Sequence, residues 1–131
     1  MAKVDIQMLR NRSDEVLDAL EEAVQAALEE VGMQAQNYAT AICPHQTGRL
    51  QGSITHATTR MASSVTKPAT PSDGVTGAPD DRCVVIGTNV EYAAYVEHGA
   101  QGRDPQKYLE PAVMDHRAEW RDIFDEHLRN A

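Results

Sequence analysis

The stretch Cys43–Ile54, CPHQTGRLQGSI, joins two different sequence patterns and decides how the chain folds. A long helical pattern leads up to it. Pro44 predicts the end of that helix, because a proline pushes the residue before it out of helical geometry. Thr47-Gly48 is then typical of a turn, since glycine adopts backbone conformations that other residues resist. The chain is therefore expected to turn a corner here.

The pattern after the corner favours a strand. Every second residue is apolar, small or histidine: Leu50, Gly52, Ile54 and His56. This alternation predicts a strand over residues 49–59. We interpret the corner as structural, with Thr47 and Ser53 capping or bridging it, and direct contact with a partner is the alternative.

The pattern before the corner predicts one long helix of about eight turns. Its apolar residues are spaced by threes and fours: Leu17, Leu20, Val24, Leu28, Val31, Ala35, Tyr38 and Ile42. Ser13 is expected to cap the helix, with Asp14 and Glu15 in the first turn, where the helix dipole favours carboxylates. Such a helix spans ~45 Å, more than a small domain needs, so we expect part of it to pack on something else.

Val4, Ile6 and Met8 alternate with polar residues ahead of this helix. The alternation suits a short strand, and an extended arm over residues 1–12 would look the same. These three residues are candidates for an interface.

Residues 61–82 are rich in Ser, Thr, Pro, Gly and Ala and almost empty of large apolar side chains. Such a segment buries too little surface to offset its ordering entropy, so we expect one long mobile loop. The run CVVIGT, Cys83–Thr88, predicts a second strand that lies antiparallel to the first across this loop.

Thr88-Asn89-Val90-Glu91 has the form of a capping box, in which the Thr88 hydroxyl and the Glu91 carboxylate each accept a backbone N–H. It favours a short helix over residues 91–98, which Gly99 is placed to end.

Within that short helix, Tyr92, Val96 and Glu97 are expected to serve as core and capping residues. Tyr95 is expected to point outward and is a further interface candidate.

The last pattern predicts an amphipathic helix that begins near Glu110, because Pro111 is tolerated in a first turn and not in a helix interior. Its apolar stripe is again helical in spacing: Leu109, Ala112, Val113, His116, Trp120, Ile123, Phe124 and Leu128.

Together these elements predict an α+β fold over residues 1–131, folded as a single domain. A long N-terminal helix and a C-terminal helix pack on a small, mainly antiparallel β-sheet with one long mobile loop. The free edges of so small a sheet would invite pairing with a neighbouring subunit.

The charge of the chain argues against a protein that grips the phosphate backbone of nucleic acids. The formal net charge is −8, whereas such binding needs clustered Lys and Arg. Fifteen of the twenty acidic residues lie in residues 1–30 or 104–131. We interpret them as the solvated faces of two amphipathic helices, and a surface that faces a basic partner or a channel is the alternative.

The chemistry of the side chains predicts no catalytic, cofactor or metal site. Glu97-His98 and Cys43 with His45 are the most suggestive pairs, but neither has a recognisable third member. No two histidines stand four residues apart beside a carboxylate, as a zinc site on a helix would require. Enzymatic use of Glu97 and His98 remains an alternative hypothesis.

The opening residues lack the apolar run of a secretion signal, and no stretch reaches transmembrane length. Cys43 and Cys83 stand alone, which is typical of buried thiols in a reducing compartment. We therefore expect synthesis in the cytoplasm and no membrane partner.

The order of the elements and their short motifs resembles the tail-component family of long-tailed, lambdoid-type bacteriophages, the small head–tail joining or tail-completion proteins. The resemblance covers nearly the whole chain from the first helix onward. The residues that carry it are Pro44, Thr47, Gly48, Leu50, Ser53, Ile54, Tyr92, Ala93, Tyr95, Val96, Glu97, Gly99, Leu109, Pro111 and Ala112. His98 departs from the family pattern, in which an aromatic residue is usual.

This resemblance implies a virion structural protein of the neck or tail, which acts as a homo-oligomeric ring between the portal or adaptor complex and the tail tube. DNA would pass its lumen without specific binding. The protein would reside in the host cytoplasm during assembly and then in the virion. The alternative is a small soluble phage-encoded binding or regulatory module that acts as a monomer or dimer outside the virion.

Overall fold

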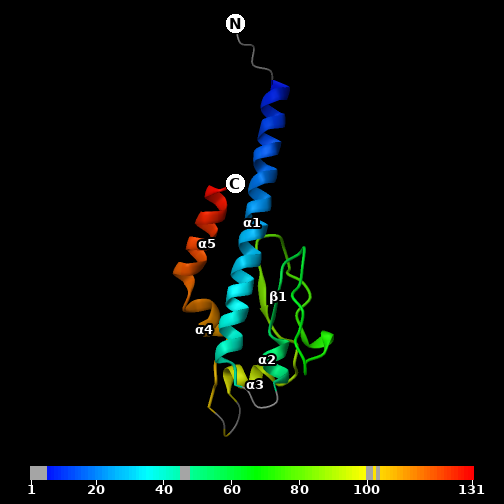
Figure 1. Ribbon diagram of the computed structural model, residues 1–131, viewed down its shortest axis with the longest axis vertical. Helices are drawn as coiled ribbons and strands as arrows, with labels where there is room; N and C mark the ends of the chain where they lie inside the picture. The colour runs from blue at the N-terminus through cyan, green and yellow to red at the C-terminus, as the bar shows by residue number, and fades with distance from the viewer. Residues whose placement is uncertain (1–5, 45–47, 100–101, 103) are drawn as a thin grey trace.

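The computed structural model describes residues 6–44, 48–99, 102 and 104–131, with backbone alone for residues 6–12. In chain order its elements are α1 (Ile6–Ile42), α2 (Arg49–Ser53), β1 (Thr55–Ala57), the 3-10 helix η1 (Pro71–Asp73), β2 (Val85–Gly87), α3 (Ala93–His98), α4 (Leu109–Met114) and α5 (Arg117–Arg129). Figure 1 shows α1 as the spine, with α4 and α5 on one side and the β-segments on the other. The predicted α+β fold is confirmed.

The long N-terminal helix is confirmed, but its predicted start was wrong. α1 begins at Ile6, so Ser13 lies inside the helix and does not cap it. Ile6 and Met8 are helical, which makes the predicted strand or extended arm wrong for them; Val4 lies outside the described residues. Residues 7–10 are Gln, Met, Leu and Arg, all good helix formers, and they extend the helix upstream.

The helix start also changes the expected role of two carboxylates. Asp14 and Glu15 lie more than a turn inside α1 and not in its first turn. Any benefit from the helix dipole is therefore lost to them, since that effect fades beyond the first turn.

The strand predicted over residues 49–59 was wrong in its first half, which forms the helix α2. Leu50 and Ile54 are four residues apart, a spacing that fits one face of a strand as well as one face of a helix. Gly48 decides for the helix, because its φ of 82° is left-handed and turns the chain into α2. Ser53 then donates a hydrogen bond of 2.6 Å to the Leu50 carbonyl, one turn back.

The two strands pair antiparallel, as predicted, but each is only three residues long. Thr55 pairs with Gly87, His56 with Ile86 and Ala57 with Val85. These two strands, called the hairpin below, pack on α1 at Gly32, where the helix lacks a side chain. A Cβ atom on Gly32 would lie 2.7 Å from His56 Cδ2 and 2.8 Å from Val84 Cγ2. The missing side chain therefore allows the close contact between sheet and helix.

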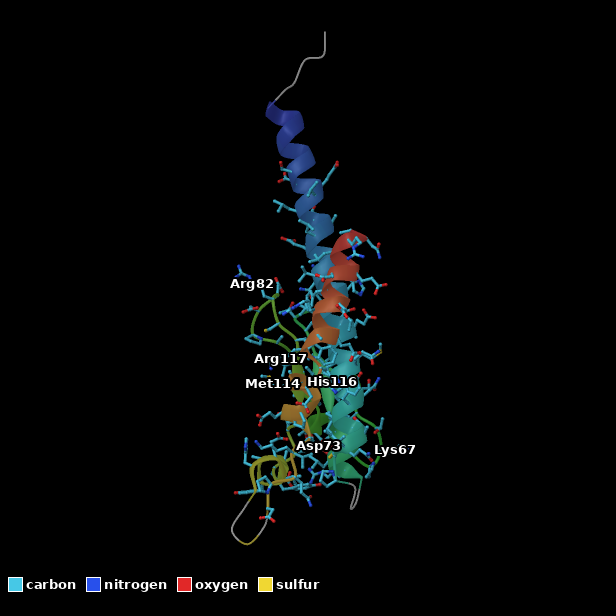
Figure 2. All side chains as sticks on the ribbon, turned by 90° about the vertical axis from the view of Figure 1, so that its left-hand side faces the viewer. Lys67, Asp73, Arg82, Met114, His116 and Arg117 are labelled. Atoms are coloured by element: carbon cyan, nitrogen blue, oxygen red, sulfur yellow. The ribbon has the colours of Figure 1, made fainter. Side chains whose placement is uncertain are left out.

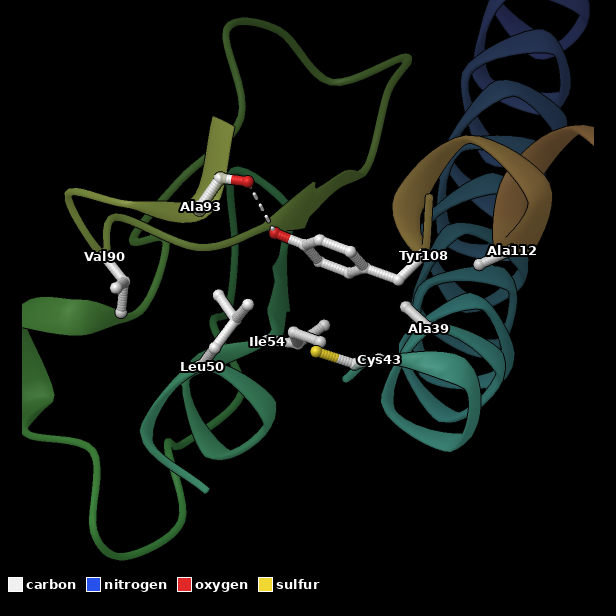
Figure 3. Packing of buried hydrophobic residues seen from close by; sticks show 8 residues of the cluster. All are labelled: Ala39, Cys43, Leu50, Ile54, Val90, Ala93, Tyr108 and Ala112. Carbon is white, nitrogen blue, oxygen red and sulfur yellow. Dashed lines mark hydrogen bonds between the residues drawn. The ribbon is translucent and has the colours of Figure 1, made fainter. Parts of the chain in front are cut away.

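The core has two clusters along α1. The lower one surrounds Tyr108, which is fully buried and donates a hydrogen bond of 3.3 Å to the Ala93 carbonyl (Figure 3). Its other members are Ala39, Cys43, Leu50, Ile54, Val90, Ala93 and Ala112. The upper cluster joins Ala27 and Val31 of α1 to Ile123 of α5. Of the stripe predicted for the long helix, Val31 belongs to the upper cluster and Tyr38 packs against the lower one. The buried Ala27, Ala39 and Cys43 lie beside the predicted positions, and the predicted Ile42 is 51% exposed.

The last helix was predicted as one element and is two. α4 ends at Met114, and α5 begins at Arg117. His116 between them stacks on Tyr38 of α1, with ring centroids 3.6 Å apart and planes at 3°. Trp120 donates its indole N–H to the Val113 carbonyl at 2.7 Å, across the break. The bend therefore lets the stripe follow the surface of α1.

The segment 61–82 has no regular strand, as expected, but it carries η1 and several contacts to the body. Ala62 bridges to Ala57, and Gly74 bridges to Thr88. The segment thus runs beside the outer edges of both strands, and the predicted free sheet edges are partly covered. Its mobility remains a prediction.

Replacing Gly48 with valine is expected to lower the free energy of unfolding by about 1–2 kcal/mol, because a side chain is strained at a left-handed φ. Gly48→Asn is the matched control, since asparagine tolerates this conformation better than a β-branched residue. Thermal melts of the three proteins measure the order. Equal melting temperatures for the valine variant and the wild type would contradict the left-handed turn.

Candidate functional site

The Glu97 carboxylate at the base of the molecule is a structural cap. Its Oε1 accepts backbone N–H bonds from Tyr108 and Leu109, each at 2.9 Å, and its Oε2 accepts one from Glu110 at 3.1 Å. These three amides form the start of α4, where an α-helix has unpaired donors. Glu97 belongs to α3, so one side chain joins the two short helices.

The three hydrogen bonds from backbone N–H groups to Glu97 argue against the hypothesis that Glu97 and His98 act in catalysis. Burial by itself raises the pKa of Glu97, but the three N–H donors outweigh it, and the pKa lies below its ordinary value of 4.5. A general base near neutrality needs a raised pKa. His98 beside it is exposed. The expected capping role of Glu97 is thus what the geometry shows.

The Cys43 thiol is also poorly suited to nucleophilic chemistry. Burial, together with the charge of Glu97, raises its pKa to about 11. The thiolate, which is the reactive form, is therefore scarce at neutral pH. Its sequence neighbour His45 lies outside the described residues.

Arg49 at the start of α2 makes a charged junction that the sequence patterns did not reveal. Its Nε and Nη2 donate to the two carboxylate oxygens of Asp73, at 3.1 and 3.0 Å. Its Nη1 and Nη2 donate to Glu91 at 3.0 and 3.2 Å. The Arg49 guanidinium lowers the pKa of Asp73 to about 2, and the Thr70 backbone N–H contributes to this shift.

Asp73 is the buried partner of this junction, with its side chain 6% exposed. Together with Thr70 it completes a capping box for η1. Its backbone carbonyl also accepts the Asn89 N–H at 2.7 Å. One residue in the segment 61–82 therefore connects α2 with the turn that follows β2.

The capping box predicted over Thr88–Glu91 was wrong. Glu91 pairs with Arg49, and α3 begins only at Ala93. The Thr88 hydroxyl instead accepts the Val90 N–H at 3.0 Å and shares a hydrogen bond of 2.6 Å with the Ser53 hydroxyl. Glu91 therefore pairs with the distant residue Arg49 instead of capping the helix that follows it.

The residues that carried the family resemblance gather at this base of the molecule, around the lower core cluster. Four of them lie in its buried part, and three more pack against it: Leu50, Ile54, Ala93 and Ala112, then Tyr92, Val96 and Leu109.

The remaining motif residues shape the backbone around that cluster. Gly48 and Gly99 both have φ above 80°, Pro44 follows the end of α1, and Pro111 lies in the first turn of α4. Thr47 lies outside the described residues.

Tyr95 is the exception among these residues. Its side chain is 65% exposed, as expected for an interface candidate. Of the other interface candidates, Ile6 and Met8 lie in the first turns of α1.

Within the described ranges, no group of three or more His, Cys, Asp or Glu residues is placed to hold a metal ion. In the same part of the chain, no helix combines the length and the apolarity that crossing a membrane requires.

A family model with the description "Bacteriophage HK97-gp10, putative tail-component" matches residues 6–99. The matched region runs from the start of α1 to the glycine that ends α3, so α4 and α5 lie beyond it. No curated protein and no solved structure shows a significant match to the chain.

Replacing Glu97 with glutamine is expected to lower the free energy of unfolding by about 1–3 kcal/mol at neutral pH, since a neutral amide accepts the α4 amides less strongly. The pKa of Glu97 is lowered on folding, so its contribution is complete above the ordinary value of 4.5 and is lost as the pH falls through the folded value.

The measurement for Glu97 is denaturant unfolding of both proteins across the acid range. The gap in stability between them should narrow below about pH 4.5. A gap that stays constant with pH would show that the carboxylate charge plays no part.

Replacing Arg49 with leucine is expected to lower the melting temperature, because it leaves the buried Asp73 carboxylate without this guanidinium. Arg49→Lys should fall between leucine and wild type, since an ammonium keeps the charge but not the forked geometry. Calorimetry of the three proteins measures the order. A leucine variant as stable as the wild type would contradict the assigned role.

Proposed function

Because the chain belongs to the HK97-gp10-like family of bacteriophage tail components, we propose that it acts at the neck of the virion, in head–tail joining or tail completion. In this role the protein is an oligomeric connector, arranged as a ring between the portal or adaptor proteins and the tail tube. The observation that carries the proposal is the family match over α1 to α3, which includes the corner and most of the motif residues at the base.

The shape of the molecule supports an assembled rather than an isolated role. α1 extends well beyond the rest of the protein (Figure 1). Val16, Leu17 and Leu20 on this extension are 58%, 56% and 40% exposed. Tyr95 presents a further exposed aromatic ring at the opposite end. A protein with apolar groups at both ends is suited to contacts with two neighbours.

The charge of the chain fits a connector through which DNA passes. A net charge of −8 repels a phosphate backbone and discourages adhesion to it. A family of structural tail components also agrees with the capping role of Glu97 and the raised pKa of Cys43, neither of which favours catalysis.

The test is a phage in which the reading frame for this chain carries an early stop codon. The expected lysate contains DNA-filled heads and separate tails, and a plasmid copy of the wild-type chain restores joined, infectious particles. Electron micrographs and plaque counts are the measurements.

Peptide mass spectrometry of purified wild-type virions completes this test. Particles that assemble normally without the chain would contradict the proposal. Absence of the chain from wild-type virions, with a monomer or dimer in solution, would favour the alternative of a regulatory or binding module.

A further inference from the structure

We propose that the N-terminal part of α1, residues 13–24 (the arm), binds the outward face of α5 in a second copy of this chain. The inference rests on the proposed function as a ring connector and deepens it by naming the two surfaces that meet.

The arm carries an apolar stripe whose first part, at Val16 and Leu17, lacks a cover among the described residues. Farther along α1, Ala27 and Val31 continue the same stripe and are buried against Ile123 of α5, with Val84 of the hairpin region beside them. Val16 and Leu17, in contrast, are more than half exposed. Figures 1 and 2 both show the start of α1 standing past the last turn of α5. The stripe therefore continues beyond the elements that cover it.

A cleft of about 410 Å³ opens at the foot of the arm. Leu17, Leu20, Glu21 and Val24 line it from α1, and Arg60, Asp81 and Arg82 line it from the facing loops. The apolar stripe thus runs into a groove that holds charged groups of both signs, and Arg60 pairs there with Glu22 of the same chain at 2.9 Å.

The floor of the cleft contains a buried polar side chain, Gln25. Gln25 lines the cleft and is 4% exposed. Its Nε2 donates to the Asp81 carbonyl at 2.8 Å. Its Oε1 is buried and has no hydrogen-bond partner among the described residues. Such an atom is costly unless a partner supplies a donor.

The charge of the arm determines which kind of surface can bind it. Residues 13–24 include five acidic residues and no basic one. Two arms packed on each other would therefore bring like charges together, which is unfavourable. The partner surface must instead combine apolar groups with positive charge.

The outward face of α5 has this combination. Arg117 and Arg121 are one turn apart and exposed, and Leu128 follows two turns later on the same side, 40% exposed. Met114, at the end of α4, adds a side chain that is 47% exposed. The opposite side of α5, with Ile123, is already used against α1 of the same chain.

The pairing is complementary in a second respect. Asp122 and Asp125 are exposed on α5, where they can face Arg82 across the cleft of the neighbouring copy. The arm and the α5 face are different parts of one chain, so the contact is head-to-tail. A contact of this kind closes into a ring when the rotation between copies allows it.

The test reverses the charge on each side separately and then on both. The arm variant is Asp14→Arg with Asp18→Arg, and the α5 variant is Arg117→Glu with Arg121→Glu. Each alone is expected to weaken self-association by about tenfold or more, as measured by sedimentation velocity over a concentration series. The variant with all four changes keeps the net charge and is expected to regain association.

A control is Lys67→Glu, which adds negative charge as the α5 variant does but lies away from both surfaces. It should associate like the wild type. Thermal melts of all variants confirm that the exposed substitutions leave the fold intact.

The same variants, supplied to the phage with the stop codon, give a second readout. Loss of plaques with each one-sided variant, and recovery with the four-fold variant, supports the contact even if the free chain is monomeric. Association and plaque counts that none of the reversals changes would overturn the contact, and virions that still contain the chain would leave the proposed function standing. Absence of the chain from wild-type virions would overturn the proposed function itself, and the sedimentation series alone would then decide the contact.

Discussion

α1 contacts α4, α5, β1 and β2, and its single apolar stripe sets where each of them lies. Helix α5 and the hairpin approach this stripe from two sides, and Gly32 lets the hairpin come within contact of the helix backbone. The other elements are short, from three to thirteen residues, and helices of this length are marginal in isolation. Their stability therefore depends on burial against α1.

The helices at the base of the molecule, α2, α3 and α4, have only five or six residues each and need further contacts to stabilise them. Two charged side chains make these contacts. Glu97 fixes the start of α4 from α3, and Arg49 fixes the start of α2 to Asp73 and Glu91. Both act over eleven or more positions in sequence. This arrangement gives several of the motif residues at the base a structural role.

Several features of this fold could be predicted from the sequence because they depend on local pattern. The stripe of α1, the antiparallel hairpin, the short helix before Gly99 and the place of Pro111 in a first turn all follow from spacing and backbone preference. Where the spacing fits two periods, the prediction fails. Leu50 and Ile54 are compatible with a strand or a helix, and only the left-handed Gly48 decides between them.

Contacts between residues far apart in the chain could not be predicted from the sequence. The composition of the segment 61–82 predicts a polar loop, yet the segment contributes Asp73, the buried partner of Arg49. The sequence Thr88–Glu91 has the form of a local capping box, whereas Glu91 in fact pairs with Arg49. Likewise, the break at His116 follows from stacking on Tyr38, a residue nearly eighty positions earlier. Such contacts depend on the tertiary structure and produce no periodic pattern in the sequence.

We expect α1 to be covered along one part of its stripe by its own chain and along the arm by a neighbour. Hydrogen exchange of backbone amides, followed by mass spectrometry, measures this directly on the dilute chain and on purified virions. Peptides of α1 from residue 27 onward are expected to exchange slowly in both samples, and residues 13–24 are expected to be protected in the virion alone. Equal exchange of the arm in both samples would contradict a neighbour that covers it.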